Sequence, residues 1–267
     1  MAELSSSRTQ PGSRQIHRES NVRAIIGLVV IGFSCVLGYP SRADAASTPD
    51  YAALIAAPDR TDADRKNDDR RKAVQLLAFT GVLPGWKVID MAAGAGYSTE
   101  LMARGVAPDG VVYAQNPPDM RAEAKKGMDE RMTHPAMKIV VPDVQAFDAP
   151  VPAGVGNLDL ITFFFGYHDT TFMSVDRAKM NKAMFDALKP GGHLIIADYA
   201  ALPGAPLTTG KTFHRLDEDI EKREIEAAGF KLVDEGMFLR SPADPRNMPI
   251  FHPTIPIDIF VLKFEKP

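Results

Sequence analysis

A histidine between a tyrosine and an aspartate is the best acid–base candidate in the sequence. Tyr167, His168 and Asp169 follow an apolar run and a glycine, and all three are candidate catalytic residues. Imidazole titrates near neutral pH, so His168 could act as a base or orient an acceptor, with Asp169 fixing its tautomer. A structural loop in which His168 only bonds the backbone is the competing interpretation. His214 is the second histidine candidate, although it could equally cap or pack against a helix.

Two glycines in a short turn form the most informative ligand-binding element. Gly94 and Gly96 follow an apolar run that contains Asp90, and glycine allows a backbone to turn tightly and approach a ligand. A dinucleotide-binding site would require glycine or alanine at position 99, but this residue is Thr99. It would also require an acidic residue at the end of the next strand, which instead ends with Asn116. The sequence therefore disfavours NAD and indicates a nucleoside bound in another way. A tight turn without a ligand is the simpler alternative.

Composition excludes several other classes of function. The chain has 267 residues, a net charge of −3 and one cysteine, Cys35. This charge provides no basic field for a nucleic acid, and one thiol cannot form a disulfide framework. No His-x-x-x-His pair or closely spaced carboxylate set is present, so we predict no metal site. A Gly-x-Ser-x-Gly nucleophile turn is also absent.

Strand patterns alternate with helix patterns along most of the chain. We expect strands over 86–91, 111–114, 137–141, 158–165, 193–197, 231–238 and 259–264, and helices over 62–79, 98–104, 118–131, 178–188 and 215–228. Near-continuous apolar strands separated by helices predict a parallel α/β sheet covered on both faces, and the last two strands predict an antiparallel hairpin. The glycine turn and His168 then lie at the carboxyl edge of the sheet, where such folds bind ligands. Tyr199 follows the fifth strand and could wall an acceptor pocket, while the charged run 62–72 is a solvated helix face or the rim of a site.

Two motifs resemble class I S-adenosylmethionine-dependent methyltransferases. They are Val-Ile-Asp-Met-Ala-Ala-Gly-Ala-Gly at 88–96 and Leu-Lys-Pro-Gly-Gly-His-Leu-Ile-Ile-Ala-Asp at 188–198. Segments 166–169, 213–217, 226–230 and 260–264 are more narrowly similar to a group of exported methyltransferases. The resemblance covers roughly 86–267 and implies a Rossmann-like fold with a seven-stranded, mostly parallel sheet in the order 3-2-1-4-5-7-6.

The same resemblance implies where the cofactor lies. S-adenosylmethionine would lie over the carboxyl ends of strands one, two and four, and Ala92 replaces a glycine that is usual in the family. The resemblance implies that the methionine and ribose side of the cofactor is contacted by Asp90, Ala93, Gly94 and Gly96. The amide of Gln115 or Asn116 would bind the ribose diol, and Asp143 would contact adenine. Methyl transfer is an in-line displacement in which alignment supplies much of the rate.

The first 45 residues have the pattern of a secretory signal peptide. A basic segment precedes an uncharged stretch over 24–39, and Ala43 and Ala45 fit an A-x-A cleavage site. We expect cleavage after Ala45 and a periplasmic or secreted protein, with an uncleaved membrane anchor as the alternative. The predicted organisation is therefore a leader at 1–45, a helical lead-in at 46–80 and a methyltransferase domain at 81–267.

The predicted function is methylation of a small-molecule acceptor, with no nucleic-acid partner. Two alternatives stay open at this point. One is an exported binding protein of the same fold whose catalysis is lost or repurposed, as Ala92 and the missing ribose carboxylate suggest. The other, a nicotinamide-dependent oxidoreductase, is opposed by Thr99 and Asn116.

Overall fold

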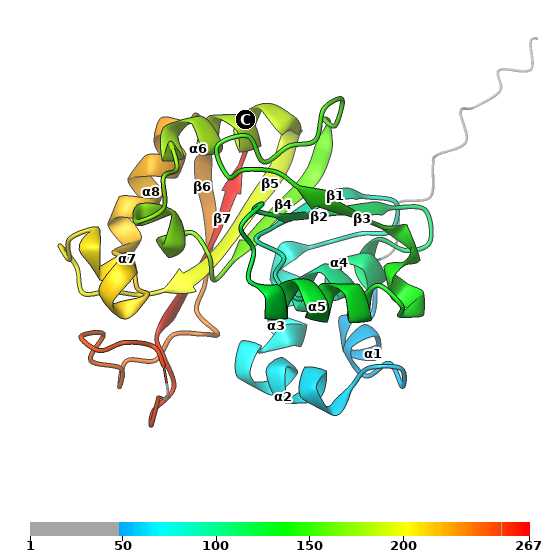
Figure 1. The fold of residues 1–267 in the computed structure, drawn as a ribbon, viewed down its shortest axis with the longest axis horizontal. Helices are drawn as coiled ribbons and strands as arrows, with labels where there is room; N and C mark the ends of the chain where they lie inside the picture. Colours follow the sequence, from blue (N-terminus) through cyan, green and yellow to red (C-terminus); the bar gives the residue numbers. More distant parts are fainter. Residues whose placement is uncertain (1–47, 252) are drawn as a thin grey trace, which may run out of the picture. The chain divides into compact units, whose positions relative to one another are not determined.

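A seven-stranded sheet forms the centre of the protein (Figure 1). The structure is a computed structural model that describes residues 48–251 and 253–267, which belong to one compact unit. The strand order is β3-β2-β1-β4-β5-β7-β6, as predicted. The strands are β1 (Lys87–Met91), β2 (Val111–Asn116), β3 (Val140–Val144), β4 (Leu158–Phe164), β5 (Leu188–Tyr199), β6 (Lys231–Gly236) and β7 (Ile259–Glu265).

The sheet is parallel from β3 to β5 and antiparallel at its other end. β7 pairs antiparallel with both β5 and β6, so the predicted C-terminal hairpin is confirmed, with β7 as its inner strand. Strands β1 and β4 and the second half of β5 are almost entirely buried because helices cover both faces of the sheet. The five parallel strands β3, β2, β1, β4 and β5 therefore bring their carboxyl ends to one edge.

Two hydrophobic cores lie on the two faces of the sheet. One core contains residues of α1 (Tyr51–Ile55), α3 (Ala73–Thr80), α4 (Tyr97–Val106) and α5 (Ala122–Arg131). The other contains residues of α6 (Arg177–Ala187) and α8 (Glu218–Ala227). Alternation along the strands explains the division, since Val88 packs in the first core and Ile89 in the second.

The predicted helix over 62–79 is two helices. Thr61 caps α2 (Asp62–Arg71) in a reciprocal capping box with Asp64, and the chain then turns at Lys72, which has φ +50°. This left-handed residue ends α2 and precedes α3, in which Leu76 and Leu77 are buried and Val74 is exposed.

Several other helices and strands begin at residues different from those predicted. Met137 belongs to the short 3₁₀ helix η1 (Pro135–Ile139), so β3 begins at Val140 rather than at 137. The helix expected from 118 begins at Ala122, and the helix expected from 215 begins at Glu218 because Asp217 is its N-cap. A short helix that we did not predict, α7 (Thr208–Phe213), precedes it.

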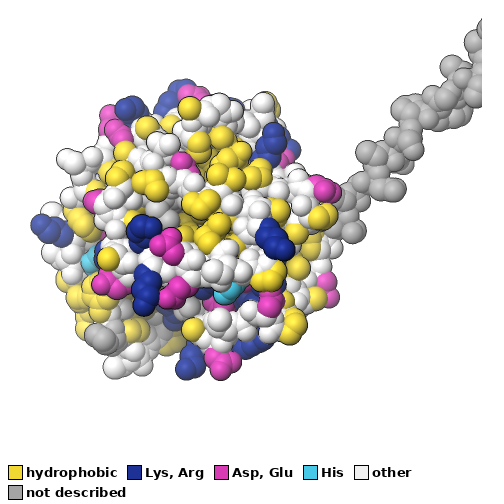
Figure 2. Space-filling model, turned by 45° about the vertical axis from the view of Figure 1, so that its right-hand side comes forward, with side chains coloured by type: hydrophobic (Ala, Val, Ile, Leu, Met, Phe, Trp, Pro, Cys, Tyr) yellow, Lys and Arg dark blue, Asp and Glu magenta, His cyan; other side chains and the backbone are white. Residues whose placement is uncertain are grey.

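The predicted leader at 1–45 lies outside the described residues. Among the residues that the structure does describe, no helix is both long and apolar enough to span a membrane. In the turned view of Figure 2, hydrophobic side chains gather in the upper middle of the molecule, with Lys, Arg, Asp and Glu intermixed around them. This face therefore carries no field of a single sign.

Candidate active site

A cavity of about 600 Å³ opens at the carboxyl edge of the sheet. Its lining comes from the turns after four parallel strands, which the sequence places far apart. These contributions are Ala92 and Gly94 after β1, Asn116 at the end of β2, Tyr199 at the end of β5, and four residues after β4, namely Phe165, Gly166, His168 and Asp169. The cavity therefore contains both the glycine turn and the predicted histidine.

Asp90 holds the glycine turn in place from the interior of the fold. Its carboxylate accepts hydrogen bonds from the hydroxyls of Thr162 (2.6 Å), Thr99 (2.6 Å) and Ser98 (2.9 Å). The side chain is fully buried and does not line the cavity, and burial raises its pKa. We expected Asp90 to face the cofactor directly, but the three hydroxyl contacts direct it into the fold, where it positions the turn.

Two amides at the end of β2 hold the same turn. Asn116 Oδ1 accepts a hydrogen bond from the Gly94 N–H at 2.8 Å, and Gln115 Oε1 accepts one from the Ala92 N–H at 3.1 Å. The Ala93 N–H donates to the Gln115 carbonyl. Asn116 lines the cavity while Gln115 is fully buried, so Asn116 is the amide of the predicted pair that can meet a ligand.

Three non-glycine residues that line the cavity have strained backbone conformations. Ala92, Phe165 and His214 have φ values of +50°, +60° and +53°, and all three line the cavity. Such conformations cost non-glycine residues on the order of 1–3 kcal/mol and gather at functional sites. The left-handed φ of Ala92 explains why glycine is usual at its position in the resembled family. Gly96 is also left-handed, with φ +81°, and begins α4.

Asp143 lies in a separate hollow of about 240 Å³ that shares Asn116 and Pro117 with the main cavity. The residue belongs to β3 rather than to the loop after it. Its Oδ2 atom is buried without a hydrogen-bond partner among the described residues, and burial raises its pKa. Asn116 lines the same hollow, and the adenine contact of Asp143 stays a prediction.

Arg71 brings a positive charge to the cavity from the end of α2. Its guanidinium lies 4.5 Å from the Phe165 ring centroid and 5.0 Å from that of Tyr97. Within the described residues it makes no hydrogen bond or ion pair, and burial lowers its pKa. The charged run therefore does contribute to the rim of the site, through a cation held between two aromatic rings.

His168 is fixed by a carboxylate that we did not predict. Its Nδ1 lies 2.7 Å from Asp198 Oδ1, and its backbone N–H donates to Asp198 Oδ2 at 2.8 Å. Asp198 is fully buried at the carboxyl end of β5. The sequence does contain a signal for this role, because Asp198 directly follows the apolar run of the predicted fifth strand and therefore lies at the strand end beside the site.

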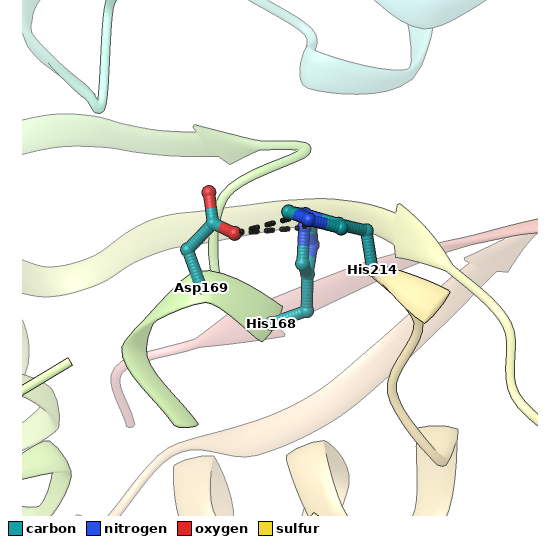
Figure 3. Close-up of side chains that lie close together, drawn as sticks. All are labelled: His168, Asp169 and His214. Carbon is teal, nitrogen blue, oxygen red and sulfur yellow. Dashed lines mark hydrogen bonds and ion pairs between the residues drawn. The ribbon is translucent and has the colours of Figure 1, made fainter. Parts of the chain in front are cut away.

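Asp169 and His214 join His168 at the cavity wall (Figure 3). His168 and Asp169 start the 3₁₀ helix η2 (His168–Thr171), and His214 follows α7. Asp169 Oδ1 lies 3.1 Å from His168 Nε2 and 3.3 Å from His214 Nδ1. Thr171 bonds the His168 carbonyl and the Leu207 carbonyl, which ties η2 to the start of α7. The structure therefore brings three of the four predicted catalytic residues together.

The electrostatics of this cluster oppose a general-base role for His168. Burial alone would lower its pKa, but the carboxylates of Asp198 and Asp169 outweigh burial and raise the pKa to about 10. An imidazole with that pKa is protonated at neutral pH and cannot accept another proton. Nearby, burial and then the charge of Asp198 raise the pKa of the fully buried Glu221 carboxyl well above its usual value.

Tyr167 lies on the other side of the turn and does not line the cavity. Its hydroxyl donates to Glu224 Oε2 at 2.9 Å and accepts from Asn181 at 2.8 Å, and the residue is fully buried against Phe163. The prediction that Tyr167 is catalytic is therefore wrong, because successive residues of this turn face opposite sides of the sheet. Phe163 and Phe164 are core residues at the end of β4.

A second hollow, an apolar groove of about 610 Å³, adjoins the cavity. Tyr199 and Ile250 line both, so Tyr199 does wall the site as predicted. The rest of the groove comes from the end of α2 and from the loop 237–258. Its apolar residues include Phe238, Leu239, Ile255, Ile257 and Ile259.

The sheet order, the glycine turn and the adjoining cavity define a Rossmann-like class I methyltransferase fold. A solved S-adenosylmethionine-dependent methyltransferase from Aquifex aeolicus superposes with a TM-score of 0.54 at 19% identity, and the match covers 78% of this chain and all of that one. At this identity the likeness establishes the fold alone.

The family follows from the sequence comparison. The ubiE/COQ5 methyltransferase family profile matches residues 67–209. Two relatives, both named ubiquinone/menaquinone biosynthesis C-methyltransferase, come from Cronobacter sakazakii (29% identity; 59% of this chain, 61% of the relative) and Idiomarina loihiensis (31%; 58% and 70%). This chain belongs to the ubiE/COQ5 methyltransferase family, and the prediction of an S-adenosylmethionine-dependent methyltransferase is confirmed at the level of fold and family. Several other relatives are matched over only about half of their length.

Proposed function

We propose that this protein transfers the methyl group of S-adenosylmethionine to a small aromatic acceptor. One observation carries the proposal: a single cavity contains both the glycine turn and the cluster of His168, Asp169 and His214. A cofactor on the turn and an acceptor beside the cluster would therefore meet without a barrier between them.

The cofactor has a complementary group at each end of this cavity. Arg71 offers an unpaired guanidinium for the carboxylate of the methionine part, and the aromatic rings on either side keep that guanidinium in place. Asp119, three residues after Asn116, is exposed and lines the cavity, so it supplies the carboxylate for the ribose diol that Asn116 lacks. The adenine ring would then lie towards Asp143.

The acceptor side is aromatic and apolar. Phe147, Phe165, Phe172, Tyr199 and Phe251 line the cavity around the histidines, and the adjoining groove can receive an apolar substituent. The names of the two relatives place them in quinone biosynthesis as C-methyltransferases. A hydroxylated aromatic ring with an apolar substituent fits both the lining and those names.

Methyl transfer needs alignment more than proton abstraction here. A lone pair or ring carbon of the acceptor would attack the methyl carbon, the carbon–sulfur bond would break, and its electron pair would stay on sulfur to give the thioether S-adenosylhomocysteine. Where a ring carbon attacks, that carbon then loses its proton to solvent, which restores the aromatic ring. The acceptor reacts as the anion of a hydroxylated ring, whose proton has left to solvent. His168 and Asp169 then position the acceptor through polar contacts.

Calorimetry of the purified protein with S-adenosylmethionine, S-adenosylhomocysteine and NAD in parallel tests the proposal. We expect the first two to bind with one site per chain, while NAD does not bind. A folded protein that binds neither sulfur compound would overturn the proposal. Binding without transfer of a labelled methyl group to any hydroxylated aromatic in a panel would instead favour the binding protein without catalysis.

We also propose that residues 1–45 direct export. The basic segment, the uncharged stretch and the A-x-A pattern support this proposal. Mass spectrometry of the protein isolated from its host should find an N-terminus at Ala46. An intact N-terminus in the cytosolic fraction would contradict export.

A further inference from the structure

Three donor atoms form a small triangle on the cavity wall (Figure 3). The sides are 3.1 Å from His168 Nε2 to Asp169 Oδ1, 3.3 Å from Asp169 Oδ1 to His214 Nδ1, and 3.3 Å between the two ring nitrogens. These three residues together form a group that could hold a metal ion. His214 is 46 positions from His168, so no local spacing in the sequence could reveal the set.

The size of this triangle matches a coordination face. Ligand bonds of about 2.0–2.2 Å with angles between octahedral and tetrahedral values separate neighbouring donors by about 2.8–3.6 Å. All three measured sides lie within that interval. Two imidazoles and one carboxylate are also the donor set of open sites that keep further positions for water or substrate.

The surroundings of the triangle resemble the outer shell of a metal site. Asp198 holds the other ring nitrogen of His168 at 2.7 Å, which is the arrangement by which carboxylates orient metal-bound histidines. Asp169 Oδ1 is buried, yet neither ring nitrogen satisfies it with a properly directed hydrogen bond within the described residues. Asp169 and Asp198 together also bring two negative charges, which match one divalent cation.

Backbone geometry positions the third ligand. His214 takes its left-handed φ of +53° at the end of α7, and its ring packs against Phe251 at 4.8 Å. Gly210 allows α7 to approach η2, because a Cβ there would overlap the Thr171 hydroxyl and lie 2.7 Å from the His168 carbonyl oxygen. Strain and close packing therefore both contribute to the position of His214.

We propose that His168 Nε2, Asp169 Oδ1 and His214 Nδ1 bind a divalent transition-metal ion of the zinc type, with an open position facing the cavity. Imidazole donors favour zinc, iron and nickel over magnesium and calcium. The role of the open position rests on the proposed function: it binds the ionised hydroxyl oxygen of the aromatic acceptor. A proton on His168 competes with the metal ion for the same nitrogen.

Metal titration of the EDTA-dialysed protein tests this proposal. A Cys35→Ser background removes the single thiol, which could itself bind metals. We expect one Zn²⁺ per chain by calorimetry and, with Co²⁺ as the probe, visible absorption bands. His214→Ala and Asp169→Asn should each weaken Zn²⁺ binding at least tenfold. Both side chains are partly exposed, at 29% and 38%, so these variants should fold.

A matched control is His193→Ala, which removes a histidine beside Glu265 in the middle of β5 and should leave Zn²⁺ affinity unchanged. Acetohydroxamate, an oxygen ligand for metals, tests the open position and should shift the Co²⁺ bands. Equal Zn²⁺ affinity in the parent and in both ligand variants would overturn the site, and bands that acetohydroxamate does not shift would overturn the open position.

Titration of the same samples with S-adenosylmethionine separates this inference from the proposed function. Cofactor binding without metal binding would overturn the metal site alone. Metal binding without cofactor binding would overturn the methyltransferase proposal and leave the site intact.

Discussion

The two sides of the cavity are built in different ways. The cofactor side, formed by the ends of β1, β2 and β3 with α2, is held by contacts around one glycine turn, such as the bond from Gly94 to Asn116. The acceptor side, formed by the ends of β4 and β5 with α7 and the loop 237–258, joins four segments that are distant in sequence. A sequence motif can therefore reveal the first side, while only the fold assembles the second.

The largest expected effect concerns the anchor of the acceptor side. Arg215 is buried and donates to both carboxyl oxygens of Asp244 and to the Met248 carbonyl, which fastens the loop 237–258 to the strand ends. Arg215→Ala leaves a buried carboxylate unpaired and should lower the free energy of unfolding by about 3–5 kcal/mol in urea titrations. Lys125→Ala, which breaks an exposed pair with Asp129, should cost less than about 1 kcal/mol. Equal losses of unfolding free energy in the two variants would show that Arg215 does not anchor the loop 237–258.

The next effect concerns the cofactor side. Arg71→Met retains much of the packing on Tyr97 and Phe165 but removes the charge, so S-adenosylmethionine should bind about ten- to a hundredfold more weakly in calorimetry. Arg70→Met is the matched control, because Arg70 lies in the adjoining groove and not in the cavity. Unchanged affinity in Arg71→Met would show that the methionine carboxylate binds elsewhere.

A pH-dependent effect follows from Asp64, which lies in the capping box of α2. Burial raises its pKa, but hydrogen bonds and charge from Arg131, and then Thr61, outweigh burial and lower it to about 2. Arg131 also donates to the Ala95 carbonyl, so this ion pair braces the glycine turn. Because the folded-state pKa is depressed, the contribution of Asp64 to stability is present above about pH 4 and lost as the pH falls towards 2.

Unfolding titrations between pH 5 and pH 2 should therefore show Asp64→Asn losing less stability than the parent. The difference should amount to about 1–2 kcal/mol. Parallel pH profiles for the two proteins would contradict the depressed pKa.

The smallest effect concerns backbone strain in the glycine turn. Ala92→Gly removes the cost of a left-handed alanine but adds chain entropy to the unfolded state. We expect a net gain of about 0.5–1 kcal/mol in the free energy of unfolding. A clear loss of stability would show that the Ala92 methyl group, which packs beside Gly166, matters more than its φ.

The fold was largely predictable because its determinants are local and periodic. Apolar strands, the two glycines and the family resemblance predicted the sheet order and the glycine turn. The break at Lys72 was not predictable, because apolar spacing carries no information on a single left-handed residue. The helix α7 was missed because six residues give too short a periodicity.

The candidate site was only partly predictable for a related reason. The sequence identified His168, Asp169 and His214 individually, but it predicted no metal-binding set because their convergence depends on tertiary packing between η2 and α7. Asp90 and Tyr167 were predicted at the correct strand ends, yet their side chains point into the fold. Strand position predicts the edge of the sheet that a residue reaches, whereas its hydrogen-bond partners decide where it faces.

The proposed function requires the cofactor's sulfur to lie between the glycine turn and the histidine cluster. A crystal structure with S-adenosylhomocysteine tests this placement. We predict its carboxylate on Arg71, its ribose near Asp119 and its sulfur facing the side that carries His168 and Asp169. A ligand in the apolar groove, or a sulfur directed away from the cluster, would overturn the proposed arrangement.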